Sequence, residues 1–170
     1  LNESAIIDIL TIKPDTFIKW DSRAGNAMVG KSGDIKWFDW EHCGTRCSID
    51  DLVWFLGGEW MPSDKKFDQE IINKTLSLFK LCNSGVSPES YLYTHAILHM
   101  CGRLNKILSL KGSKEWWSRA NCLEFEQMGV TKIEARRLVK KLAEWSSRDK
   151  LTKPLENWFY DVNDYIMRLK

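Results

Sequence analysis

The spacing of apolar residues changes along this chain, and the change falls near residue 47. Apolar residues recur at helical spacing between Asn2 and Leu10, which predicts a short helix that ends before Pro14. Three short β-prone runs follow, separated by polar or glycine-containing turns: Thr16–Ile18, Ala27–Val29 and Ile35–Phe38. Residues 1–47 are therefore predicted to contain a small β-hairpin region.

From residue 48 onward, capping residues and helical periodicity predict helices. Ser48–Asp51 has the form of a capping box with Asp in place of Glu, and an apolar run follows it. Further helix starts are predicted at Ser63, Ser87 with Pro88, Ser113, Thr131 and Pro154. The helix from Ser63 is predicted to end at about Cys82, and the helix from Ser113 is predicted to end at Gly129. We expect one domain over residues 1–170, mainly α, in which residues 48–170 form the helical region.

Composition limits the classes of function. The sequence has 25 basic and 23 acidic residues. The net charge of +2 is too close to zero for a protein that mainly binds phosphate backbones, so nucleic-acid binding is not expected. No run of about 18 apolar residues occurs in the sequence, so no membrane-spanning segment is predicted. The five cysteines are an odd and widely spaced set, which predicts reduced thiols and a cytoplasmic location.

Three polar residues around the predicted hairpin, Asp21, Asn26 and Asp39, form a candidate catalytic set. Phosphoryl transfer from ATP requires a carboxylate beside the acceptor hydroxyl and oxygen ligands that hold Mg²⁺ against the phosphates. In this interpretation Asp21 accepts the hydroxyl proton, whereas Asn26 and Asp39 bind magnesium. Arg23 would neutralise charge on the transferred phosphoryl group.

This segment resembles the aminoglycoside phosphotransferase family, which belongs with the choline kinases in the protein-kinase-like fold. The family pattern is His-Gly-Asp, four residues, Asn, a hairpin, Ile-Asp-Trp-Glu, and Asp-Leu at the next helix. The matching stretches, which lie between Thr16 and Leu56, are Ile18–Asn26, Phe38–Glu41 and Asp51–Leu52. The resemblance implies that Asp21 is the catalytic-loop Asp, that Asn26 and Asp39 bind Mg²⁺ with ATP, and that Asp51 braces the loop.

The resemblance also implies that the chain is the C-terminal helical lobe of a kinase-like fold, without the N-terminal lobe that holds the nucleotide. Because the sequence begins at Leu1 rather than Met, we expect a piece of a longer protein. The longer protein would transfer the γ-phosphoryl group of ATP to a small hydroxyl-bearing molecule. We expect the 170 residues alone not to be catalytically competent.

Two residues depart from the family pattern, because Lys19 and Trp20 stand where the family has His and Gly. We therefore expect the backbone support of the loop to differ. The departure and the missing lobe leave a second function open, namely a non-catalytic kinase-like helical module that binds a protein or an anionic partner.

Local structure offers alternative explanations for some of these residues. Asp21 and Asn26 are also typical turn residues, and helix capping alone explains Asp51. Asp39 differs, because it stands between Phe38 and Trp40, where a buried carboxylate without a partner would be costly. This position predicts a metal or a hydrogen-bond donor beside Asp39.

Other clusters are interpreted as structural. Helical periodicity places Cys101 toward the core and both His95 and His99 on the outer side of their helix, which argues against a zinc site. The spacing of His42, Cys43 and Cys47 fits no common metal site, and the basic stripe of the helix after Thr131 is interpreted as a solvated face. Three tryptophans lie where the family builds its acceptor pocket: Trp60, Trp116 and Trp117. Aromatic walls suit a cationic or ring-bearing substrate.

Overall fold

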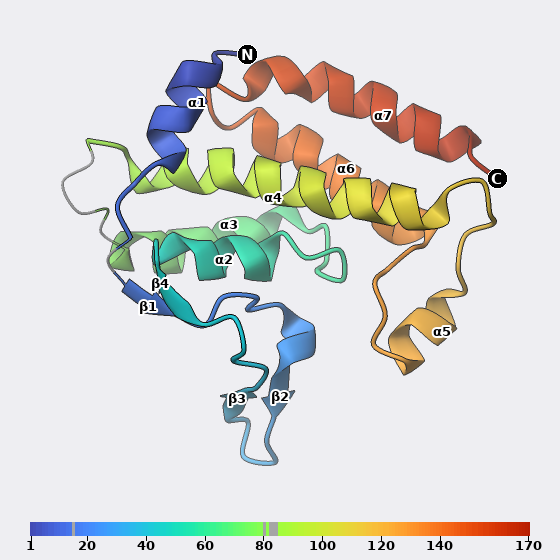
Figure 1. Cartoon of the computed structure of the whole chain (residues 1–170), viewed down its shortest axis with the longest axis horizontal. Coiled ribbons are helices and arrows are strands. Elements are labelled where there is room, and N and C mark those ends of the chain that lie inside the picture. The colour runs from blue at the N-terminus through green and yellow to red at the C-terminus, as the bar shows by residue number, and fades with distance from the viewer. Residues whose placement is uncertain (15, 80, 82–84) are drawn as a thin grey trace.

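Stacked helices make up most of the molecule, and a small hairpin projects from one side of them (Figure 1). The computed structural model describes residues 1–14, 16–79, 81 and 85–170. The described helices are α1 (Glu3–Leu10), α2 (Ile49–Leu56), α3 (Lys65–Thr75), α4 (Pro88–Lys111), α5 (Arg119–Glu124), α6 (Lys132–Ser146) and α7 (Glu156–Arg168), with short 3-10 turns η1 (Ala24–Asn26), η2 (Leu76–Leu78) and η3 (Lys153–Leu155). The prediction of a mainly helical chain is confirmed.

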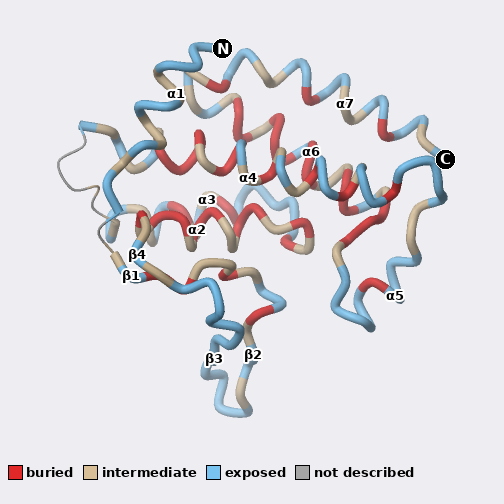
Figure 2. The backbone as a smooth tube through the Cα atoms, in the orientation of Figure 1, coloured by how far each residue is buried: buried red, intermediate tan, exposed pale blue. Residues whose placement is uncertain are grey.

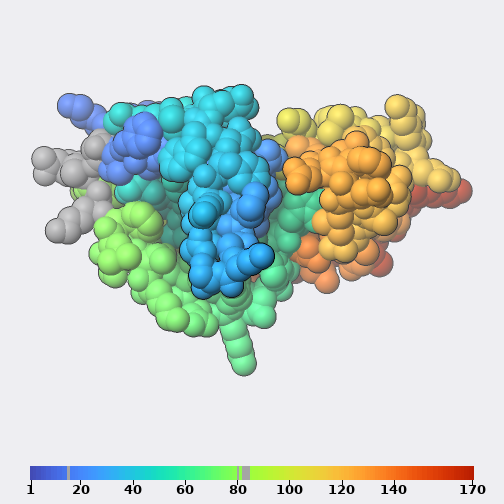
Figure 3. Space-filling model, turned by 90° about the horizontal axis from the view of Figure 1, so that it is seen from below, coloured from blue at the N-terminus to red at the C-terminus, as the bar shows by residue number. Residues whose placement is uncertain are grey.

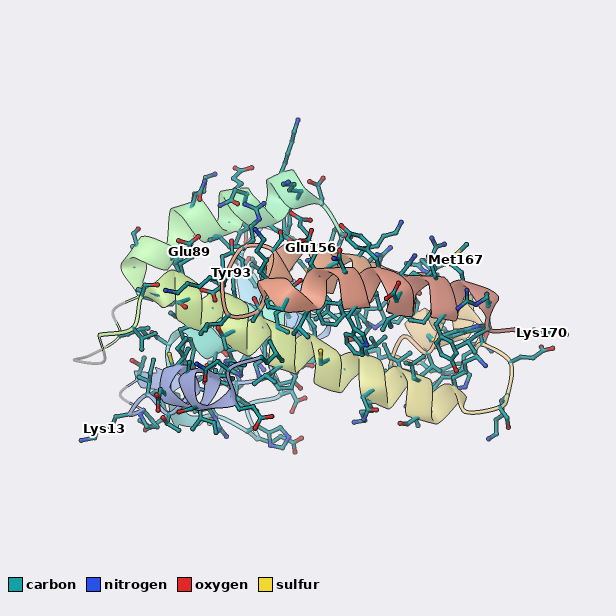
Figure 4. The ribbon with its side chains drawn as sticks, turned by 90° about the horizontal axis from the view of Figure 1, so that it is seen from above. Lys13, Glu89, Tyr93, Glu156, Met167 and Lys170 are labelled. Atoms are coloured by element: carbon teal, nitrogen blue, oxygen red, sulfur yellow. The ribbon has the colours of Figure 1, made fainter. Side chains whose placement is uncertain are left out.

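The core lies around α4. Helices α1, α2 and α6 pack against α4, and α7 packs against α6. Figure 2 shows the buried backbone concentrated in α2, α4 and α6. Seen from above, α7 runs from Glu156 to Met167 on top of the other helices, and Tyr93 lies in the first half of α4 (Figure 4). The Tyr93 ring meets the Trp145 ring edge-on, with centroids 5.5 Å apart, which joins α4 to α6 in the core.

The strands form two separate antiparallel pairs. In the first, β1 (Thr16–Ile18) pairs with β4 (Gly44–Arg46), with Phe17 opposite Thr45. In the second, β2 (Ala27–Val29) pairs with β3 (Ile35–Trp37), with Met28 opposite Lys36. The sequence analysis missed β4, because Gly-Thr-Arg has no apolar alternation and its pairing depends on a distant strand.

Several helix starts lie where the sequence predicts them. The side chains of Ser87 and Thr131 accept hydrogen bonds from backbone N–H groups in the first turns of α4 and α6, as predicted, and Asn2, which was not predicted as a cap, does the same in α1. These caps satisfy donors that have no partner within the helix. The predictions hold because a cap depends only on residues within one turn.

Other helix boundaries differ from the predictions. Ser48 makes no side-chain cap bond because its backbone is already helical, and α3 is capped by Asp64 rather than by Ser63. The predicted end of that helix at Cys82 lies outside the described residues, and α3 itself ends at Thr75. Pro154 lies in η3, so α7 begins two residues later.

The segment between α4 and α6 is less helical than predicted. Helix α5 is capped by Ser118 rather than Ser113, because residues 112–114 form a turn and the backbone N–H of Trp117 donates to the Val130 carbonyl at 2.9 Å instead of to a helical carbonyl. It ends well before Gly129, since Glu126 adopts a left-handed φ of 49°. Among the described helices, none combines the length and the apolar character that a membrane crossing requires.

Candidate active site

The loop between β1 and β2 is held by the buried ammonium group of Lys19. Its Nζ donates to the backbone carbonyls of Asp39 at 2.9 Å, Asp21 at 3.2 Å and Trp20 at 3.4 Å. The residue is only 5% exposed, and Nζ lies 5.9 Å and 5.8 Å from the ring centroids of Trp37 and Trp40. Lys19 therefore brings the loop and the end of the hairpin together, a role that the sequence did not indicate.

The three carbonyls that Lys19 binds belong to residues with a strained backbone. Trp20, Asp21 and Asp39 adopt φ values of 57°, 48° and 58°, in the left-handed region that favours glycine. Such a conformation costs about 1–3 kcal/mol per residue and persists only where the surroundings hold it. The hydrogen bonds from Lys19 supply that restraint, including at Trp20, where the family pattern has Gly.

Helix α2 provides a second anchor for the loop. The Oδ2 atom of Asp51 accepts a hydrogen bond from the backbone N–H of Lys19 at 3.0 Å. The hydroxyl of Ser22 donates to the backbone carbonyl of Asp51. Because Ser48 forms no capping bond, the contact of Asp51 is with the loop rather than within a capping box.

Asn26, Arg23 and Asp21 meet inside the loop. Asn26 is 5% exposed, and its Nδ2 donates to the Asp21 carbonyl at 2.9 Å. Arg23 forms an ion pair with Asp21 at 3.2 Å, from Nη2 to Oδ2. The other carboxylate oxygen, Oδ1, is buried and has no hydrogen-bond partner among the described residues. A buried acceptor without a partner is costly, so the loop holds one unsatisfied carboxylate oxygen at Asp21.

Asp39 is exposed to solvent, and the prediction that it is buried between aromatic side chains is wrong. Phe38 and Trp40 are themselves 40% and 46% exposed, because this end of the hairpin faces outward. Across the parts of the chain with described positions, no hydrogen bond or ion pair engages the Asp39 carboxylate.

The hairpin register brings Asp39 close to the loop residues. Ala27 is paired with Trp37, and the backbone N–H of Phe38 donates to the Asn26 carbonyl at 3.1 Å. Lys19 binds the carbonyls of both Asp21 and Asp39. The structure thus collects the three residues that the sequence analysis singled out.

Asn26 and Asp39 carry the oxygen donors that Mg²⁺ prefers. Asn26 uses its Nδ2 toward the protein, which leaves the amide oxygen as a hard ligand, and the Asp39 carboxylate is available as a second. No group of three or more His, Cys, Asp or Glu side chains suited to a metal occurs within the described ranges. A magnesium ion at this place would take the rest of its coordination shell from phosphate oxygens and water.

A cavity of about 280 Å³ adjoins the loop. Its lining comes from residues 23–26 of the loop, from the end of α2 with residues 58–61, from α4, and from the α5 segment at residues 122–127. Figure 3 shows the hairpin, in light blue, beside the yellow and orange segment that contains α5. The cavity lies between the loop and the α5 segment; of the candidate site residues, Arg23 and Asn26 line it, whereas Asp21 and Asp39 do not.

His95 and His99 do not lie on an outer face of α4, so that prediction is wrong. His95 Nδ1 lies 2.9 Å from Asp50 Oδ1, and this oxygen accepts a hydrogen bond from the Tyr91 hydroxyl at 2.7 Å. The His99 ring packs against Trp54, with centroids 4.4 Å apart. The reason is that α2 covers the side of α4 that periodicity alone left exposed.

Burial also changes the proton affinity of groups on α4. Burial, with smaller contributions from Arg103 and His95, lowers the pKa of His99 from 6.5 to about 4. Burial raises the pKa of the Cys101 thiol to about 11. The Cys101 side chain packs against the core, as periodicity predicted. His99 is therefore neutral at physiological pH.

A buried ion pair that the sequence analysis missed lies beside the cavity. Arg103 donates to both carboxylate oxygens of Glu59, with contacts of 2.6–3.0 Å, and the backbone N–H of Gly129 donates to the same carboxylate at 3.3 Å. Burial alone would raise the pKa of Glu59, but the charge and hydrogen bonds of Arg103 lower it below its usual value. No motif relates these residues, because they meet only when α4 packs against the end of α2.

Of the three tryptophans expected at an acceptor pocket, one lines the cavity. Trp60 does so, and the guanidinium carbon of Arg119 lies 5.6 Å from its ring centroid. Trp116 and Trp117 are half-buried and pack against the core instead. In the cluster after the hairpin, His42 and Cys43 are exposed whereas Cys47 is buried, so these three side chains differ in environment.

Comparison with known proteins adds no assignment, because no protein-family model, no curated protein and no solved structure matches the chain significantly.

Proposed function

We propose that this chain is the helical C-terminal lobe of a kinase-like phosphotransferase, which transfers the γ-phosphoryl group of ATP to a hydroxyl group of a small molecule. One observation supports the proposal above all others. Lys19 binds the carbonyls of three residues with left-handed backbone, two of which are Asp21 and Asp39. Strain of this kind clusters at functional sites, where it places side chains for chemistry.

In the proposed reaction each residue has a role that suits its atoms. Asp21 orients the acceptor hydroxyl through its unpaired Oδ1 and accepts the proton as the hydroxyl attacks. Arg23, already paired with Asp21, offsets negative charge on the transferred group. Asn26 and Asp39 would hold Mg²⁺, which would neutralise negative charge on the phosphate groups of ATP. Asp51 positions the loop through the N–H of Lys19.

A second candidate function is a non-catalytic helical module of the same type, which binds a protein partner. It is favoured by apolar side chains that β1 and the hairpin expose, since Phe17 is 65%, Met28 61% and Val29 70% exposed. Exposed apolar patches of this kind commonly mark interaction sites. In the leading proposal the N-terminal nucleotide lobe would cover this surface.

The test is a phosphotransfer screen with labelled ATP and Mg²⁺ on the longest natural form of the protein that contains this chain. Asp21→Asn is expected to lower turnover by about 10²-fold or more and to leave nucleotide affinity nearly unchanged. Asp39→Ala is expected to lower both turnover and nucleotide affinity in magnesium, because it removes charge that holds the metal.

Asp8→Asn, at an exposed position of α1, is the matched control and should change neither quantity. Near-normal turnover of Asp21→Asn would contradict the assignment, because the loop from Lys19 to Asn26 contains no other carboxylate. Absence of both turnover with every acceptor and binding of ATP with magnesium would favour the non-catalytic module.

A further inference from the structure

We infer that the cavity beside the loop binds an uncharged, hydroxylated ring compound of about the size of a nucleoside or a monosaccharide, and not a multi-ring polycation. That this compound is the phosphoryl acceptor rests on the proposed function. The binding itself is inferred from the size, charge and unpaired polar atoms of the cavity.

The volume of the cavity limits the size of its ligand. At about 280 Å³ it lies at the small end of ligand pockets, which typically measure about 300–1,000 Å³. A pocket of this size encloses one ring or two joined rings. A polycation of three linked amino sugars would leave most of its surface outside, and its extra charges would find no enclosed partners.

The charges around the cavity are mostly paired within the protein. Glu59 is 2% exposed and is bound by Arg103 through both carboxylate oxygens. Arg23 is paired with Asp21 at the loop side. The remaining carboxylate of the lining belongs to Glu126, which is exposed to solvent, so that water and salt screen its charge. The interior therefore has no unpaired carboxylate to bind an ammonium group.

Two buried polar atoms of the lining residues lack partners, and a hydroxylated ligand would satisfy them once their rings turned toward the cavity. Within the described residues, neither the Nε1 of Trp54 nor the Nε2 of His99 has a hydrogen-bond partner. A buried polar group without a partner is unfavourable, so a ligand that pairs with it gains affinity. The indole of Trp54 can only donate, whereas neutral His99 can donate or accept, and hydroxyl groups match both.

Aromatic walls complete the recognition of a ring. Trp54 and Trp60 both line the cavity, and the Trp54 ring is held in place by Trp20 on one side and His99 on another, at centroid distances of 5.4 Å and 4.4 Å. A rigid indole that is already in position can stack on a flat or chair-like ring without loss of further rotamer entropy.

Calorimetric titration of the 170-residue chain, without ATP or Mg²⁺, tests the inference with four probes. Uridine and methyl β-glucoside are uncharged ring compounds, choline is a monocation, and kanamycin is a multi-ring polycation. At least one uncharged probe is expected to bind about tenfold more tightly than choline and kanamycin. Tighter binding of either cation overturns the inference, and so does failure of both uncharged probes to bind at millimolar concentration.

Variants test whether His99 and Trp54 determine the affinity. His99→Leu is expected to weaken binding of the uncharged probe by about tenfold, because it removes both ring nitrogens. His99→Gln retains a polar group and should stay within about threefold of the wild type. Trp54→Phe keeps an aromatic wall but removes the N–H, so it also weakens binding and provides a second test if His99→Leu fails to fold.

His42→Gln is the matched control, because His42 is exposed and lies outside the lining. Unchanged affinity in folded His99→Leu and in Trp54→Phe overturns the inference. Failure of the proposed function gives a different result: the uncharged probe binds with the expected dependence on His99, but the longest form of the protein does not phosphorylate it. Asp21-dependent phosphorylation of kanamycin alone would support the phosphotransferase and overturn the inference about the cavity.

Discussion

At the scale of single residues, Lys19 controls the shape of the candidate catalytic loop, because its ammonium group restrains three carbonyls at once. Lys19→Met keeps most of the length of the side chain but leaves these carbonyls without their shared donor. We expect the free energy of unfolding to fall by about 1–3 kcal/mol, the cost of leaving buried polar groups unpaired. Urea denaturation followed by far-UV circular dichroism measures this change.

Lys31→Met provides the comparison for Lys19→Met, since Lys31 is an exposed lysine in the turn of the β2–β3 hairpin. Its stability should stay within about 0.5 kcal/mol of the wild type. Equal stabilities of the two variants would show that the Lys19 ammonium does not hold the loop.

A second residue, His99, makes stability depend on pH. Burial holds the pKa of His99 at about 4 in the folded chain, whereas its ordinary value is 6.5. The unfolded state therefore binds the proton more readily, so the stability contribution of neutral His99 is complete above about pH 6.5 and is lost as the pH falls toward about 4. We expect a loss of about 1–3 kcal/mol over this interval.

Urea denaturation of wild type and His99→Gln at several pH values between 7.5 and 4 measures this effect. The wild type should lose more stability on acidification than the variant, which has no titrating group at this position. If the stabilities of the two proteins fall equally with pH, His99 is not the source of the pH dependence.

At the scale of elements, a buried ion pair joins α3 and α6 to the end of α2. Lys141 Nζ donates to Asp68 at 3.0 Å and to the Leu56 carbonyl at 2.9 Å, and Trp145 Nε1 donates to the other Asp68 oxygen at 3.3 Å. Burial raises the pKa of Asp68 and lowers that of Lys141, although each partner's charge opposes the shift. Desolvation thus outweighs the attraction for both groups.

Removal of one partner should therefore be more harmful than removal of both. Lys141→Met is expected to lower the free energy of unfolding by about 3–5 kcal/mol, since it leaves a buried carboxylate without its cation. Lys140→Met, on the exposed side of the same helix, should have little effect. In a double-mutant cycle, Lys141→Met with Asp68→Leu should recover part of the loss, and strictly additive losses would contradict this coupling.

At the scale of the whole molecule, the projecting hairpin exposes several apolar side chains to solvent. Val29 and Ile35 are opposite each other in the β2–β3 register and are 70% and 62% exposed. Apolar strands at the edge of a sheet favour association with other chains. We expect the chain to associate as its concentration rises and to bind a hydrophobic dye.

Val29→Lys combined with Ile35→Glu should suppress both effects and leave the stability of the monomer nearly unchanged, because neither side chain contributes to the core. Light scattering coupled to gel filtration and dye fluorescence measure the two effects. Thr75→Ala, on α3 and outside the hairpin, is the control and should associate like the wild type. Association that is unaffected by the hairpin variant would place the contact surface elsewhere.

The sequence by itself determined the features that depend on neighbouring residues. The starts of α4 and α6 follow from caps that act within one turn, and the β2–β3 hairpin follows from two short β-prone runs around a glycine-containing turn. Asp21, Asn26 and Asp39 were selected by their spacing, and the structure gathers them, while the chemical roles proposed for them stay predictions.

Only the tertiary structure decided the features that need distant residues to meet. The pairing of β4 with β1, the restraint of the loop by Lys19 and the ion pair of Glu59 with Arg103 join segments that no periodicity relates. The exposure of individual side chains was decided in the same way. Periodicity predicted that His99 is exposed, and the flanking aromatic residues predicted that Asp39 is buried. In the structure α2 covers His99, and nothing in the described chain covers the end of the hairpin. Periodicity gives the direction of a side chain from its own element, whereas burial depends on what another element places opposite it.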